Sequence, residues 1–156
     1  MELIIVIAII AIIAAAIFVA LDPARRLHEA RNARRWSDVA TMLDAVRKYQ
    51  VDNDGTHYSS VAGLTQSENF VVGTNGVTGC DAGCTGVTTQ PQCVDISSIG
   101  TNYLAEVPLD PATGAATFSD YYLSVDANGA VTVGSCDPEG EGAGGGGSAP
   151  TIRVIR

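Results

Sequence analysis

The sequence predicts an α+β fold in which a long N-terminal helix packs on a small antiparallel sheet of about three strands. Residues 3–21 are uninterruptedly apolar, and apolar residues then recur every three or four positions to about residue 51. The segments FSDYYLSV and AVTVG flank DANG, which contains Asn128-Gly129, a dipeptide typical of β-hairpin turns. A long helix followed by a short meander of strands is the simplest fold that fits both patterns.

The chain has 156 residues, enough for one membrane-length helix and one small domain. We expect a hydrophobic helix over 1–23, its amphipathic second half over 24–52, and a globular head over 53–156. Within the head we expect a hairpin over 118–135 and a C-terminal strand over 151–156. The Gly-rich segment before that strand resembles a flexible linker. Because the strand-like TIRVIR follows it, we interpret it as a native loop.

The apolar run reads LIIVIAIIAIIAAAIFVAL. Its 19 residues would span about 29 Å as a helix, close to the hydrocarbon thickness of a bilayer. A cleaved secretion signal is the alternative, but such a signal needs a basic segment before a shorter apolar core. No Lys or Arg precedes this run, so it predicts a membrane helix.

Glu2 stands at the head of this run. A carboxylate in lipid or in a dry interface is costly and usually has a partner, which makes it a functional candidate. The alternative is that Glu2 lies at the water interface and interacts with the positive end of the helix dipole.

Asp22-Pro23 predicts a break or a kink in the helix. Asp is a good N-cap, and Pro at the first helical position cannot continue the preceding hydrogen-bond ladder. Beyond it an amphipathic helix is expected, with an apolar face that covers the head and with Trp36 as a packing residue. That face comprises Leu27, Ala30, Ala33, Trp36, Val39 or Ala40, Leu43 and Val46.

Charge is unevenly distributed along the chain. No Lys or Arg occurs between Tyr49 and Ile152, a stretch that holds 12 acidic residues, whereas 22–48 has 7 basic and 4 acidic residues. The acidic head is a poor surface for nucleic acid, which is bound mainly through Lys and Arg. In the basic segment Glu29, Asp38 and Asp44 are interleaved at helical spacing, which favours packing and ion pairing.

Four cysteines all lie in the head: Cys80, Cys84, Cys93 and Cys136. An even number in a small domain predicts two disulfides formed in an oxidising compartment, in preference to a metal site. Three pairings are possible, and we favour Cys80–Cys84 with Cys93–Cys136, because the second bond would tie a long loop to the sheet.

The predicted topology contains a conflict. Arg25 and Arg26 after the apolar run favour a cytoplasmic head, whereas the cysteines favour an external one. The conflict disappears if basic residues precede Met1 in the gene product.

Enzyme motifs are absent from the sequence. No GxSxG, HExxH, GxxxxGK or GxGxxG pattern occurs, and His28 and His57 are poorly placed to activate a Ser or Thr. The expected function is therefore not catalytic.

The opening MELIIVIAIIAIIAA resembles the N-terminal motif of type IV pilins and pseudopilins, in which a Glu precedes an apolar helix. The resemblance covers about residues 1–21. It implies the pilin fold, with an αβ-loop between the helix and the sheet. The stretch DPARRLHEARNARRWSDV is also similar to pilin-like proteins of very small episymbiotic bacteria.

This resemblance implies a structural subunit that polymerises through its N-terminal helix into an extracellular filament serving adhesion, motility or uptake. The implied partners are identical subunits, and before polymerisation the inner membrane and the pilus assembly machinery. In the family the matching Glu meets the N-terminal amine of a neighbouring subunit. The implied assembly residues are Glu2, Leu3, Ile4, Ile5, Val6, Ile7, Ile10, Ile13 and Phe18.

No cofactor is expected, apart from calcium as a minor alternative. VPLDPATG followed by YY resembles the calcium-loop region of the major pseudopilins, with Asp110, Asp120 and Asp126 in or beside it. Hard oxygen ligands on a turn suit Ca²⁺. The stronger interpretation is that these three are ordinary solvated turn residues.

The sequence departs from the family at its start. A few residues, usually headed by a methylated Phe, precede the position of Met1 in the family, and a basic leader precedes them. We therefore expect the mature chain to begin before Met1. Two alternatives stay open: a major pseudopilin of a type II secretion-like system, and a membrane-anchored binding domain that never polymerises.

Overall fold

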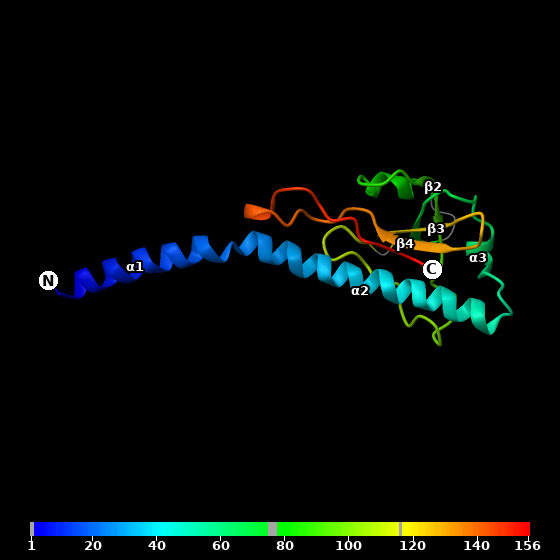
Figure 1. Cartoon of the computed structure of the whole chain (residues 1–156), viewed down its shortest axis with the longest axis horizontal. Coiled ribbons are helices and arrows are strands. Elements are labelled where there is room, and N and C mark those ends of the chain that lie inside the picture. The colour runs from blue at the N-terminus through cyan, green and yellow to red at the C-terminus, as the bar shows by residue number, and fades with distance from the viewer. Residues whose placement is uncertain (1, 75–77, 116) are drawn as a thin grey trace. The chain divides into compact units, whose positions relative to one another are not determined.

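A computed structural model describes residues 2–74, 78–115 and 117–156, without the side chain of Glu2. Its elements, drawn in Figure 1, are α1 (Glu2–Leu21), α2 (Pro23–Asp52), α3 (Ser59–Ala62), β1 (Phe70–Gly73), η1 (Cys80–Gly83), β2 (Gln90–Val94), β3 (Phe118–Val125), β4 (Val131–Ser135), η2 (Ala143–Gly145) and β5 (Arg153–Ile155). The fold is α+β, as the sequence predicted.

The chain divides into two compact units. The first comprises Met1–Ala30 and Glu139–Pro150, and the second comprises Arg31–Pro138 and Thr151–Arg156. Helix α2 begins in the first unit and continues in the second unit, which also contains the sheet.

In the first unit, Asp22 separates the two helices. Its φ of 41° is left-handed, a conformation that Asp tolerates better than most residues, and Pro23 begins α2. The Asp22 carboxylate accepts hydrogen bonds from the backbone N–H of Arg25 (3.3 Å) and of Gly144 (2.7 Å). The interruption therefore lies at the predicted Asp22-Pro23 position, and the Gly-rich loop is bonded to it.

The sheet of the second unit has five strands in the order β2-β1-β3-β4-β5. The prediction of about three antiparallel strands was therefore wrong, because β1 and β2 add to the sheet and pair with each other in parallel. Strand β1 is only four residues long, and β2 reads QPQCV, which has neither an apolar run nor clear alternation. Neither strand has a periodic apolar pattern, so both segments lay within the predicted αβ-loop.

The hairpin predicted around Asn128-Gly129 is present. Strands β3 and β4 pair antiparallel from Tyr121↔Ser135 to Val125↔Val131. Gly129 has a φ of +79°, which the turn requires. The Asp126 carboxylate accepts the N–H of Asn128 and of Ala130, at 2.8 and 2.7 Å. Strand β5 then pairs antiparallel with β4.

The core lies between α2 and the sheet (Figure 1). From α2 it takes Val39, Met42, Leu43, Ala45 and Val46, all buried against sheet residues such as Tyr121, Leu123, Val131 and Val133. Upstream of Val39 the predicted apolar face was wrong. Trp36 is 43 % exposed and Ala33 is exposed, whereas Asn32 and Arg35 are buried. That part of the helix faces a carboxylate rather than apolar side chains, as described next.

Candidate functional site

The most exposed feature is the apolar surface of α1, which we define as the side chains of residues 3–21. Each of them is exposed. Apolar residues occur all round the helix, so no polar stripe is available to face water. The stretch is long and apolar enough to cross a membrane, by length and composition alone. Each predicted assembly residue for which exposure is known is more than half exposed: Leu3, Ile4, Ile5, Val6, Ile7, Ile10, Ile13 and Phe18.

Glu2 begins helix α1, which places its backbone at the head of the apolar surface. The partner of its carboxylate stays a prediction, because the side chain lies outside the described part of the chain.

A buried ion pair joins α2 to the loop before β3. Arg35 Nε lies 2.6 Å from Asp110 Oδ2, Arg35 Nη2 lies 2.9 Å from Asp110 Oδ1, and both side chains are fully buried. Arg35 Nη1 also donates to Asn32 Oδ1 (2.8 Å), one turn back on the helix. A two-pronged contact of this kind fixes both the rotation and the position of α2.

Asp110 is held ionised. Burial alone would raise the pKa of its carboxyl, but the hydrogen bonds from Arg35 and from the backbone N–H groups of Ala112 and Thr113 outweigh it and lower the pKa. The turn after Asp110-Pro111 thus wraps its backbone donors around the carboxylate, while the helix supplies the counter-charge.

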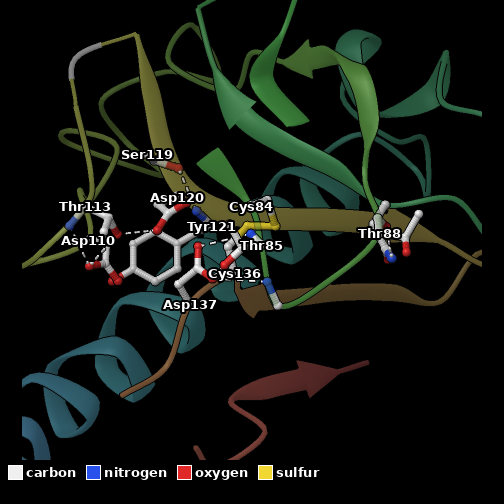
Figure 2. Close-up of a disulfide and its surroundings, with 12 residues drawn as sticks. Cys84, Thr85, Thr88, Asp110, Thr113, Ser119, Asp120, Tyr121, Cys136 and Asp137 are labelled. Carbon is white, nitrogen blue, oxygen red and sulfur yellow. Dashed lines mark hydrogen bonds between the residues drawn. A yellow bond between two sulfur atoms is a disulfide. The ribbon is translucent and has the colours of Figure 1, made fainter. Parts of the chain in front are cut away.

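Asp120 lies beside this pair in an unusual setting. It is fully buried on β3 with a left-handed φ of 65°, and its Oδ1 has no hydrogen-bond partner. Figure 2 shows the Thr113 hydroxyl bonded to both Asp110 and Asp120. Burial raises the pKa of Asp120 to about 6, the bond from Thr113 opposes this, and the charges of Asp137 and Asp110 add to it.

A second group of contacts surrounds Asp137 (Figure 2). Its carboxylate accepts the Thr85 hydroxyl and the backbone N–H groups of Thr85 (3.2 Å) and Gly86 (3.0 Å). These contacts lie next to the disulfide between Cys84 and Cys136. They connect the loop that follows η1 to the segment that follows β4.

The predicted disulfides are present, but the favoured pairing was wrong. The structure joins Cys80 to Cys93 and Cys84 to Cys136. Because η1 places Cys80 and Cys84 near different strands, Cys80 reaches β2, whereas Cys84 reaches the residue after β4. Each bond therefore ties the η1 segment to the sheet, which a Cys80–Cys84 bond could not do.

The structure does not bring the three calcium candidates together. Asp110 and Asp120 flank Thr113, but Asp126 lies at the far end of β3 and caps the hairpin turn. Both oxygens of Asp110 are bonded to Arg35. Among the residues described, no group of three or more His, Cys, Asp or Glu is arranged to hold a metal ion.

Sequence reasoning missed Arg35, Thr113 and Asp137. A signal for Arg35 was available, since Asn32, Arg35, Val39, Met42 and Val46 recur at three or four positions and share one helix face. Because that helix face contains an arginine and an asparagine, the spacing of apolar residues alone favours a face through Trp36 instead. Nothing comparable in the sequence marks Thr113 or Asp137.

Replacing Asp120 by Asn should stabilise the second unit at neutral pH. Asp120 has a higher pKa folded (about 6) than unfolded (3.8), so the folded state binds the extra proton and stability falls as pH rises between these values. Asn is neutral and tolerates the left-handed backbone. We expect Asp120→Asn to gain about 1–3 kcal/mol above about pH 7 and little below about pH 4, measured by urea unfolding.

Asp126→Asn is the matched control. Backbone hydrogen bonds, first from Ala130, lower the pKa of Asp126, so losing this charge should destabilise the protein at neutral pH. A pH-independent effect of Asp120→Asn would contradict the raised pKa of Asp120 in the folded state.

Comparison with models of protein families, with curated proteins and with solved structures finds no match to this chain. The functional argument therefore depends on the sequence and on the geometry described above.

Proposed function

We propose that the chain is a structural subunit of a type IV pilus, which polymerises through α1 into an extracellular helical filament. The observation that carries the proposal is the apolar surface of α1, headed by an acidic residue and attached to a folded, disulfide-bonded unit. A surface of this size must be covered either by lipid or by other protein chains.

The composition of α1 suits burial in lipid before assembly and burial by other protein chains after assembly. Its length suits a bilayer before assembly, and its lack of any polar face suits a packed bundle of identical helices afterwards. Glu2 would select the correct neighbour in that bundle, since a desolvated carboxylate is tolerated only where a counter-charge meets it. By the resemblance, that counter-charge is the N-terminal amine of the next subunit.

The two disulfides support an extracytoplasmic location for the second unit. The subunit would reach the cell surface through the cytoplasmic membrane, with its acidic unit outside. A secretion pseudopilin would share all of these features, and a monomeric anchored binding domain would share all but the self-association.

Glu2→Ala should leave membrane insertion intact and cut the yield of filaments at least about tenfold, because the partner charge is then buried without compensation. The full-length chain is purified in detergent, the detergent is dialysed away, and filaments are counted by electron microscopy. Glu29→Ala is the matched control, because Glu29 is an acid on α2 that pairs with Arg25 and Arg26. We expect it to assemble normally.

The outcome distinguishes a polymerising subunit from a monomeric anchored binding domain. Filaments with α1 near the axis support the pilin proposal. Unmodified protein that stays monomeric after the detergent is removed in the absence of lipid would overturn it in favour of an anchored binding domain.

A further inference from the structure

The second unit carries an acidic groove of about 320 Å³. It is lined by the end of β1, the segment after β2, the loop before β3 and the start of β3. Val72, Val107 and Leu109 supply apolar walls, and Asp95 and Glu106 supply carboxylates. Glu106 is exposed, and its side chain has no partner within the part of the chain that the structure describes.

Helix α2 presents a complementary charge. Lys48 is the only lysine in the sequence, and it is exposed in a second groove, of about 520 Å³, beside Val51 and Tyr103. Within the part of the chain that the structure describes, the Lys48 ammonium group forms no ion pair with an acidic side chain. Five arginines differ in this respect because acids of their own chain already pair with them: Arg25, Arg26, Arg34, Arg35 and Arg156.

We infer that Lys48 of one subunit inserts into the acidic groove of a second copy, with its ammonium group at the Glu106 carboxylate. The inference rests on the proposed function and names one contact of the filament. The four-carbon stem of Lys48 suits the apolar walls, and its charged end suits the carboxylates. No Lys or Arg occurs from Tyr49 to Ile152, so the stretch that forms the groove contains no cation of its own.

The two grooves share no residue, so this contact joins different surfaces of the two copies. A contact between unlike surfaces leaves one of each free at the ends of a dimer. Further copies then add in the same way, and where the rotation does not close a ring the product is a helical filament. A contact between Lys48 and Glu106 is therefore of the kind that can propagate along a filament.

Chemical cross-linking tests the contact directly. Filaments are assembled from a mixture of ¹⁴N- and ¹⁵N-labelled chains and treated with a water-soluble carbodiimide, which joins an amine to a carboxylate in contact with it. After digestion by a protease that cuts at acidic residues, we expect peptides joined through Lys48 and Glu106 that contain one chain of each label. Links from Lys48 to Asp44 or Asp52, one turn away on the same helix, carry a single label and serve as the internal control.

Charge exchange supplies the second readout. Lys48→Glu should raise the critical concentration for assembly about fivefold, since two like charges replace an attractive pair. Glu106→Lys should do the same, and the double variant Lys48→Glu/Glu106→Lys should return close to the original value. Lys48→Arg keeps the charge and should assemble nearly normally. Unfolding temperatures of all variants report whether each one folds.

The outcomes separate this inference from the proposed function. Filaments that form from the unmodified chain, yet give no mixed-label peptide and no rescue by the double variant, would overturn the Lys48 contact and leave the pilin proposal standing. An unmodified chain that forms no filament would overturn both.

Discussion

Arg35→Ala is expected to lower the free energy of unfolding of the second unit by about 3–5 kcal/mol, the usual cost of removing one member of a buried ion pair. The side chains of Arg35 and Asp110 are both fully buried, and their two direct contacts measure 2.6 and 2.9 Å. Removing the arginine leaves the Asp110 carboxylate with backbone donors but no counter-charge. Urea unfolding of the full-length chain in detergent measures the loss.

A neighbouring arginine is the control for this variant. Arg34 is mostly exposed and lies 3.6 Å from Asp38, so Arg34→Ala should cost at most about 1 kcal/mol. The defect of Arg35→Ala should also shrink between about pH 7 and about pH 4, because protonation of Asp110 removes the uncompensated charge. Equal losses for the two arginine variants would contradict a structural role for the buried pair.

Removing the Cys84–Cys136 disulfide should cost about 4 kcal/mol, and removing the Cys80–Cys93 disulfide about 3 kcal/mol. The difference follows from the sequence separations of 52 and 13 residues, because the longer loop loses more conformational freedom in the unfolded chain when it is closed. Double Ser variants, Cys84→Ser/Cys136→Ser and Cys80→Ser/Cys93→Ser, are compared by thermal and urea unfolding.

Pairing is verified on the unmodified chain before the variants are compared. Digestion without reduction should yield peptides joined as Cys80 to Cys93 and as Cys84 to Cys136. A larger loss from the Cys80/Cys93 variant would show that native contacts, and not loop closure, set the contribution of each bond.

Much of the α+β fold could be predicted from the sequence because its largest elements carry strong local signals. The apolar run of α1, the helical spacing from Val39 to Val46 and the Asn128-Gly129 turn each occupy one continuous segment. Strands β1 and β2 could not be found this way. They are short, and their places in the sheet depend on pairing with residues far away in the sequence.

The buried carboxylates are even harder to predict from local sequence, because their burial also depends on residues far away in the chain. Arg35 and Asp110 are separated by 75 residues, and each resembles an ordinary surface charge when considered alone. Asp120 looks like a turn residue before YY, yet its backbone conformation buries it on β3. Local patterns predict which segments form helices and turns, but a charge becomes a core residue only through its distant partner.

Strands β1 to β4 and both disulfides lie between Lys48 and Arg153, a stretch without a single lysine or arginine. Proteases prefer to nick exposed loops, and a trypsin-like protease cuts only after those two residue types. Every loop between these strands therefore lacks a cleavage site for it. The nearest sites on either side, Lys48 and Arg153, lie within α2 and β5, where the backbone is held by hydrogen bonds. Residues 49–152 are thus resistant by composition to trypsin-like proteases.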